Sequence, residues 1–126
     1  MAAISTSLMA FLNSGDHIVL QNDIYGGTRN LVEAQFQRYG IQYSFTDGLD
    51  AKSFEKEIKA NTKAIYIETP SNPLLKLVDI KQIADLSRSN GLISFIDNTF
   101  ATPLIQKPHK LGTVSYTHLT LPTKRI

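Results

Sequence analysis

The chain has 126 residues, of which 42% are hydrophobic and 19% charged, and this composition is typical of one small globular domain. The formal net charge of +2 comes from scattered basic residues, so we expect neither a nucleic-acid partner nor a membrane partner. The absence of cysteine excludes disulfides, thiolate nucleophiles and cysteine metal sites. Together with the lack of a signal-like N-terminus or a long apolar run, it fits a cytoplasmic protein.

The first part of the chain predicts helices that alternate with strands. A helix is expected over residues 1–13, because apolar residues recur there at helical spacing: Ile4, Leu8, Phe11 and Leu12. A strand over residues 17–21 follows. A second helix is expected from Thr28 to Gly40 with these residues facing inward: Leu31, Val32, Phe36 and Tyr39. Residues 41–45 alternate between apolar and polar, as a half-buried strand does.

The second part continues this alternation. Asp50 is expected to cap a helix whose Phe54 and Ile58 face inward. Residues 63–68 predict a strand, which two prolines follow within residues 69–73. Asp79 and Gln82 resemble the start of a capped helix that ends at Gly91, and residues 92–96 predict a buried strand. The order indicates an α/β domain with a mainly parallel sheet covered by helices on both faces.

Polar and aromatic residues follow three of the predicted strands. Tyr25 follows the first, Glu68 and Asn72 follow the third, and Asp97 and Thr99 follow the fourth. Parallel strands bring these ends to one side of the sheet, where ligands of α/β proteins bind. Tyr25 can stack on a flat ring, Asn72 can contact an exocyclic oxygen and Asp97 can keep a ring nitrogen protonated. Pyridoxal phosphate needs this combination, because its protonated ring withdraws electrons.

Each of these residues also has a simpler structural explanation. Tyr25 can be a packed loop aromatic, Asn72 and Glu68 can be turn residues, and Asp97 can be a cap. Three histidines share no metal-ligand spacing, so we expect no metal site and place them at the surface or at strand edges: His17, His109 and His118. A Rossmann nucleotide-binding domain is less consistent, because residues 26–27 lack the G-x-G-x-x-G pattern and no acidic residue is expected at the end of the second strand.

Five segments together resemble a known family: residues 1–5 (MAAIS), 15–19 (GDHIV), 23–28 (DIYGGT), 68–73 (ETPSNP) and 97–103 (DNTFATP). They are similar to the Cys/Met-metabolism enzymes of aminotransferase-like fold, which include cystathionine gamma-synthase, cystathionine lyases and homocysteine-forming sulfhydrylases. The resemblance implies that residues 1–112 are part of a three-layer α/β/α large domain of pyridoxal phosphate fold type I. It implies chemistry at C–S bonds of cystathionine or an activated homoserine.

The resemblance also implies roles for individual residues. Tyr25 would stack on the cofactor and assist proton transfer, which makes it the one catalytic candidate present. Asp97 would pair with the pyridinium nitrogen, and Asn72 would contact the phenolic oxygen. Met1 would help to hold the phosphate through its backbone amide, and Glu68 and Thr99 would support the pocket. The implied partners are a small amino-acid substrate and identical subunits, in a homo-oligomer of the tetramer-of-dimers type.

The resemblance stops near Gly112. The family pattern continues to Ser-x-Thr-Lys, whose lysine forms the Schiff base with the cofactor. Here Pro122 precedes Thr123 and the spacing is too long, so Lys124 is not assigned that role. Residues 113–126 are predicted to be a non-native tail, with a divergent C-terminal strand as the alternative. Because residue 1 already lies within a helix, we expect further sequence upstream.

The function expected from the sequence is therefore that of a fragment of a pyridoxal phosphate-dependent transsulfuration enzyme. The fragment itself should be inactive because the Schiff-base lysine is absent from its motif. The alternative is a non-catalytic, truncated α/β binding module. With only four predicted strands, a sheet edge and a helix face should be exposed, and the chain should associate.

Overall fold

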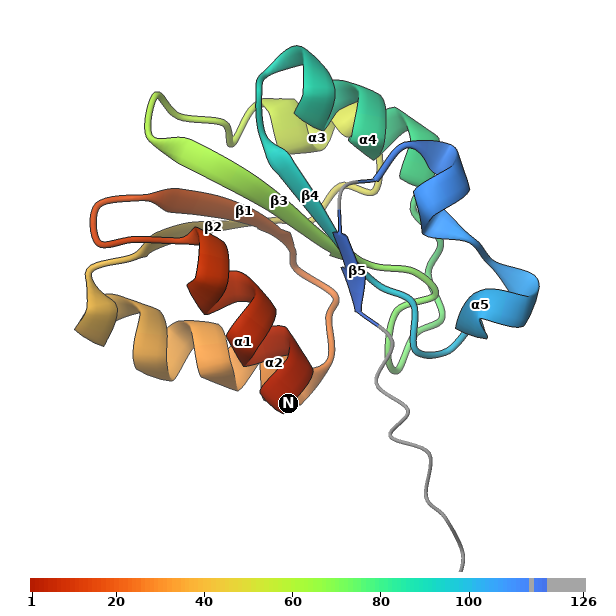
Figure 1. Ribbon diagram of the computed structural model, residues 1–126, viewed down its shortest axis with the longest axis horizontal. Coiled ribbons are helices and arrows are strands. Elements are labelled where there is room, and N and C mark those ends of the chain that lie inside the picture. Colours follow the sequence, from red (N-terminus) through yellow and green to blue (C-terminus); the bar gives the residue numbers. More distant parts are fainter. Residues whose placement is uncertain (114, 118–126) are drawn as a thin grey trace, which may run out of the picture.

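A parallel sheet of five strands forms the centre of the computed structural model, which describes residues 1–113 and 115–117 (Figure 1). The strand order is β2-β1-β3-β4-β5, and every neighbouring pair is parallel. The strands are β1 (His17–Gln21), β2 (Gln42–Thr46), β3 (Thr62–Glu68), β4 (Ile93–Asp97) and β5 (Ser115–Thr117). The predicted α/β class and parallel pairing are confirmed. Of the predicted tail, residues 114 and 118–126 lie outside the described residues, while β5 adds a strand beyond the four expected.

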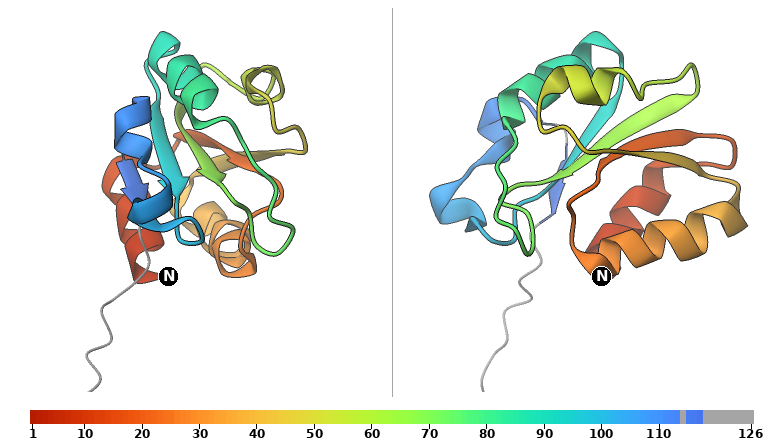
Figure 2. Two further views of the ribbon diagram at one scale, coloured as in Figure 1. Left: turned by 90° about the vertical axis from the view of Figure 1, so that its right-hand side faces the viewer. Right: turned by 180° about the vertical axis from the view of Figure 1, so that it is seen from behind.

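Helices cover both faces of the sheet and make three layers (Figure 2). They are α1 (Ala2–Phe11), α2 (Gly26–Leu31), α3 (Ala51–Glu55), α4 (Ile80–Ser89) and α5 (Thr102–Ile105). A π turn (Val32–Phe36) and a 3₁₀ turn (Gln37–Tyr39) extend α2, and another 3₁₀ turn covers Pro108–Leu111. One core lies between the sheet and α1 and α2, and a second lies between the sheet and α3 and α4. Alternation along β3 supplies both cores, because Ala64 and Tyr66 face the first while Ile65 and Ile67 face the second.

Two predicted inward residues are instead exposed. Phe11 is 48% exposed, and its ring contacts Phe95 edge-on at a centroid distance of 5.8 Å, while Ile4, Leu8 and Leu12 take the buried positions. Tyr39 is 55% exposed, because the predicted uniform α-helix is replaced by the π and 3₁₀ turns, whose different periods rotate later side chains away from the core.

The helix starts were predicted more closely than the helix ends. Asp50 and Asp79 do cap α3 and α4: the backbone N–H groups of Ser53 and Gln82 each donate to the capping carboxylate at 3.1 Å. However, α3 ends at Glu55, so Ile58 packs on the second core from beyond the helix.

His17 is fully buried, which contradicts the predicted surface or strand-edge position. It begins β1, a central strand, and its ring nitrogens lie 2.8 Å from Thr62 Oγ1 and 3.0 Å from Ser44 Oγ on the two neighbouring strands. Burial, assisted by the Lys59 ammonium, lowers the pKa of His17 to about 4. The ring is therefore a neutral link between three strands at the edge of the sheet opposite the carboxyl ends.

An acidic residue directly follows the second strand, although none was expected there. Strand β2 extends to Thr46, and Asp47 comes next, where its carboxylate accepts a hydrogen bond from Asn22 Nδ2. Within the described residues, no helix is long and apolar enough to cross a membrane. No cluster of three potential metal ligands occurs in that part of the chain either.

The strand order reverses between β1 and β3. The chain passes from β1 outward to β2 and then returns to the other side of β1 to form β3. Two loops therefore diverge at the carboxyl ends of these adjacent strands, and such a switch point leaves a crevice that can hold a ligand. Glu68 and Asp97 are register partners at the ends of β3 and β4, so their side chains enter this region side by side.

Candidate functional site

A cavity of about 190 Å³ lies beyond the carboxyl ends of β1, β3 and β4. It is lined by Met1, Tyr25, Glu68, Asn72, Asp97, Thr99 and Phe100. The structure thus brings together all six residues predicted to bind the cofactor, from segments up to about a hundred residues apart in the chain. A larger, more open groove lies elsewhere, between α1 and the α2 extension, and none of the predicted site residues lines it.

Asp97 is 2% exposed and is held by three donors. Its Oδ1 accepts hydrogen bonds from the Thr99 backbone N–H at 3.0 Å and from Thr99 Oγ1 at 2.5 Å. Its Oδ2 accepts from the Tyr66 hydroxyl at 3.3 Å. Burial and the neighbouring Asp97 carboxylate raise the pKa of Tyr66, so the phenol stays protonated and remains a donor. Asp97 caps no α-helix, because the next one begins only at Thr102.

Glu68 is a second buried carboxyl in the same cavity, with 4% of its surface exposed. Its Oε2 accepts a hydrogen bond from the Tyr25 backbone N–H at 2.6 Å. Burial, reinforced by Asp97, raises the pKa of Glu68 to about 7, while the Tyr25 amide opposes this rise. Near neutral pH, Glu68 is therefore present in both protonation states, and it fixes the backbone of Tyr25 in either state.

The Tyr25 ring lies against Gly27, where a side chain would not fit. A Cβ atom on Gly27 would clash with the Tyr25 ring and would lie 2.9 Å from Met1 Sδ. A Cβ atom on Gly26 would meet nothing within 4 Å. Of the two glycines, Gly27 is thus the one that allows the ring and Met1 to pack together at the cavity.

Helix α1 begins at this cavity, since Met1 is its N-cap and one of the lining residues. The first N–H groups of a helix have no partner within the helix and carry its positive dipole end. This end of the cavity is therefore suited to an anionic group, and the buried carboxyls at the other elements are suited to a cationic or protonated one.

Several residues near the cavity were not singled out from the sequence. Phe100 lines it and belongs to the segment DNTFATP, so its place in that segment was an available signal. Tyr66 lies two residues before Glu68 on β3, and strand alternation puts both on one face. Gln21, Asp23 and Ser71 join the loops that carry the lining residues, and no pattern in the sequence marks that contact.

A sequence model of the family described as Cys/Met metabolism PLP-dependent enzyme matches residues 1–120. The chain belongs to this family. The cystathionine gamma-lyase of Bacillus subtilis (strain 168) is 49% identical over 112 residues, which are 89% of this chain and 29% of that protein. The cystathionine beta-lyase MetC of the same strain is 47% identical over 112 residues, which are 89% of this chain and 28% of that protein.

Solved structures of the Cys/Met metabolism family have the same fold over most of this chain. The crystal structure of cystathionine gamma-lyase from Lactobacillus plantarum complexed with L-serine superposes with a TM-score of 0.86 at 46% identity, over 89% of this chain and 29% of that one. The crystal structure of metB from Corynebacterium glutamicum also gives 0.86, at 42% identity over 90% of this chain and 29% of that one. The chain thus spans less than a third of the length of these four relatives, and the aminotransferase-like fold type I assignment is confirmed.

Proposed function

We propose that this chain forms the cofactor-binding part of a pyridoxal phosphate enzyme that makes or breaks C–S bonds of cystathionine or an activated homoserine. The observation that carries the proposal is the convergence of Tyr25, Asn72 and Asp97 on one cavity at the switch point of a family member's sheet. The family match supports the cofactor, and the cavity supports the residues that would hold it.

The side chains in the cavity fit the cofactor by their chemistry. Asp97 is a buried carboxylate that three donors hold in place, and it would pair with a protonated ring nitrogen. Tyr25 offers an aromatic face, and the space made by Gly27 keeps that ring at the cavity. Asn72 offers an amide for the phenolic oxygen, and the start of α1 at Met1 offers backbone N–H groups for the phosphate.

Pyridoxal phosphate, when bound, supplies an electron-withdrawing ring that stabilises negative charge at the α-carbon of an amino acid. The residues of this chain would orient that ring and keep its nitrogen protonated through Asp97. Tyr25, which is 41% exposed and lines the cavity, would stack on the ring and assist proton transfer. Glu68, with its pKa near 7, would hold the Tyr25 backbone in place.

The names of the relatives cover several reactions. They therefore support chemistry at C–S bonds in general and do not favour one particular reaction. A cystathionine gamma-synthase/O-acetylhomoserine (thiol)-lyase of Bacillus subtilis (strain 168) is 43% identical over 112 residues, close to the values for the two lyases. The proposal therefore extends to a small amino-acid substrate that carries sulfur or an activated γ-oxygen. A cytoplasmic location, expected from the cysteine-free composition, belongs to the same proposal.

On its own, the 126-residue chain is proposed to bind the cofactor without turning over substrate. No lysine is among the described residues that line the cavity, and Lys124 is not assigned the role of Schiff-base lysine. Production of 2-oxobutanoate or pyruvate from cystathionine by the purified chain would refute this part of the proposal.

Cofactor binding can be tested with pyridoxine 5′-phosphate, whose 4-hydroxymethyl group cannot condense with surface lysines. We expect calorimetric titration to detect binding to the wild-type chain and to Gly26→Ala, because a Cβ atom at residue 26 meets nothing. Gly27→Ala should weaken binding by about tenfold or more, since its methyl group displaces the Tyr25 ring and a tenfold loss needs only about 1.4 kcal/mol. Equal affinities for the two alanine variants would contradict the assigned position of Tyr25.

We also propose that the chain associates with identical copies. Large apolar side chains are exposed on the loop that follows β3 and on α5: Leu74, Leu75, Leu77, Leu104 and Ile105. Their burial would be favourable, and exposed apolar patches mark association surfaces. Sedimentation velocity should show species larger than a monomer, and a single monomeric boundary across the concentration range would refute this proposal.

A further inference from the structure

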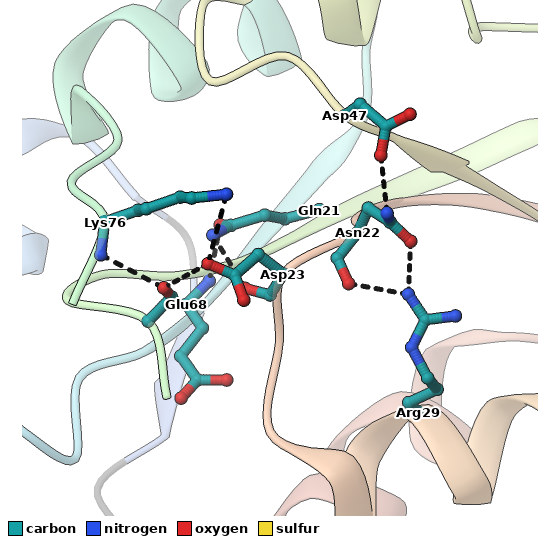
Figure 3. A network of polar contacts seen from close by, with 8 residues as sticks. Gln21, Asn22, Asp23, Arg29, Asp47, Glu68 and Lys76 are labelled. Carbon is teal, nitrogen blue, oxygen red and sulfur yellow. Dashed lines mark hydrogen bonds and ion pairs between the residues drawn. The ribbon is translucent and has the colours of Figure 1, made fainter. Parts of the chain in front are cut away.

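The β1 and β3 strands remain joined by side chains after their ladder ends. The last register pair between them is Leu20 and Tyr66. Beyond it, the buried Gln21 side chain accepts a hydrogen bond from the Glu68 backbone N–H at 3.2 Å and donates to the Asp23 carbonyl oxygen at 2.9 Å. One glutamine therefore links the start of both diverging loops (Figure 3).

Asp23 and Ser71 make the next contact between these loops. Ser71 is fully buried, and its Oγ donates to Asp23 Oδ2 at 2.7 Å. The same Oγ accepts from the Lys76 backbone N–H at 3.1 Å, while the Ser71 N–H donates to the Lys76 carbonyl at 3.0 Å. The Lys76 ammonium lies 3.7 Å from Asp23 Oδ2 and adds a partly exposed ion pair. Ser71 thus fastens its own loop and ties that loop to Asp23.

The residues on either side of this contact line the cavity. Tyr25 lies two positions after Asp23, and Asn72 follows Ser71 directly. A second hydrogen bond between the loops near the cavity is that of the Tyr25 backbone N–H, which donates to Glu68. The Asp23–Ser71 hydrogen bond therefore joins the two loops close to the positions that carry the aromatic ring and the amide.

We infer that Asp23 and Ser71 are positioning residues that hold Tyr25 and Asn72 at their binding spacing before any ligand arrives. Loops at a switch point diverge from each other. Without this bond the two loops would have to become ordered when the ligand binds, and the entropy cost of that ordering would weaken binding. The ligand's identity rests on the proposed function, whereas the coupling between the loops can be measured without a ligand.

A second group of polar contacts connects the loop after β1 to Asp47 and Arg29. The carbonyl and side-chain oxygens of Asn22 accept hydrogen bonds from Arg29, and Asn22 Nδ2 donates to Asp47, which follows β2 (Figure 3). A matched control lies elsewhere, where Ser53 Oγ donates to Asp50 Oδ2 at 3.0 Å at the exposed start of α3.

The test measures amide hydrogen exchange of the ligand-free 126-residue chain. Ser71→Ala and Asp23→Ala should each speed exchange of the Tyr25 amide by about tenfold, the size of effect expected when a hydrogen bond to a carboxylate is lost. The increase in the double variant should be well below the product of the two single increases, because the Asp23–Ser71 bond is common to both variants. Asp23→Asn keeps an acceptor oxygen and should stay within about threefold of wild type. Ser53→Ala should leave the Tyr25 amide unchanged.

Calorimetry with pyridoxine 5′-phosphate gives the second readout. Its Kd should rise about tenfold in Ser71→Ala and in Asp23→Ala, but stay close to wild type in Asp23→Asn and Ser53→Ala. Unchanged Tyr25 exchange in both alanine variants, or additive effects in the double variant, would overturn the inference. If the wild-type chain does not bind the probe, the proposed function fails, and the exchange data alone decide whether the loops are coupled.

Discussion

Replacing Glu68 by glutamine tests the central electrostatic feature of the cavity. The substitution keeps the shape of the side chain and an oxygen that can accept the Tyr25 N–H, but it removes the ionisable group. Glu68 is 4% exposed and shares the cavity with Asp97, so its ionised form is unfavourable in the folded state. We expect Glu68→Gln to be more stable than wild type at neutral and higher pH.

The size and sign of the effect follow from the raised pKa. The pKa of Glu68 rises from 4.5 to about 7 on folding, mainly through burial. Below pH 4.5 both the folded and unfolded chains carry the proton, so the substitution should change the free energy of unfolding little. Between pH 4.5 and 7 the folded chain holds the proton more tightly, so stability of the wild type falls as pH rises. The loss approaches about 3 kcal/mol above pH 7, because one pKa unit corresponds to about 1.4 kcal/mol.

Urea denaturation followed by circular dichroism at pH 4 to 8 would measure this difference. The unfolding free energy of Glu68→Gln minus that of wild type should increase with pH across the window from 4.5 to 7. Glu33→Gln is the control, since that exposed carboxylate pairs only at the surface with Arg29 and should change stability by less than about 1 kcal/mol. Parallel pH profiles for wild type and Glu68→Gln would refute the assignment of a raised pKa caused by burial.

Three further predictions concern the core and its polar contacts. The wild type should lose stability as pH falls from 6.5 through 4, by up to about 3 kcal/mol, because the folded chain disfavours the protonated His17 ring. His17→Gln should remove this loss, and denaturation at several pH values would measure the difference. Tyr66→Phe removes a donor to Asp97 and should cost about 1–2 kcal/mol of stability and weaken pyridoxine 5′-phosphate binding; unchanged affinity would show that the phenol does not orient Asp97. Leu8→Ala should destabilise the chain by about 2–5 kcal/mol in urea denaturation, whereas Leu104→Ala, at a side chain 90% exposed, should have little effect.

The order of elements could be predicted from the sequence because each is specified locally. The 92–97 segment is apolar enough to be a buried strand, and Asp50 and Asp79 cap helices through their own neighbours. Helix interiors were less predictable. The change to π and 3₁₀ turns after Leu31 depends on packing against the sheet, and it left Tyr39 exposed.

Six of the seven lining residues could also be named from the sequence, by strand-end chemistry and by family resemblance. Their supporting contacts could not. The link from Ser71 to Asp23 spans 48 positions, and that from Tyr66 to Asp97 spans 31. His17 was misplaced for a related reason, because its hydroxyl partners come from two strands that its own sequence neighbourhood does not reveal.

The α/β class, the parallel strands, the helix caps and six of the seven cavity residues could be predicted without the structure. These follow from periodicity, turn chemistry and motif order, which act over a few neighbouring positions. Three features become visible only in the folded structure: the raised pKa of Glu68, the space that Gly27 rather than Gly26 leaves for Tyr25, and the hydrogen bond from Ser71 to Asp23. Burial and hydrogen-bond partners depend on which distant segments the sheet brings together, so these properties arise only when β1, β3 and β4 lie side by side.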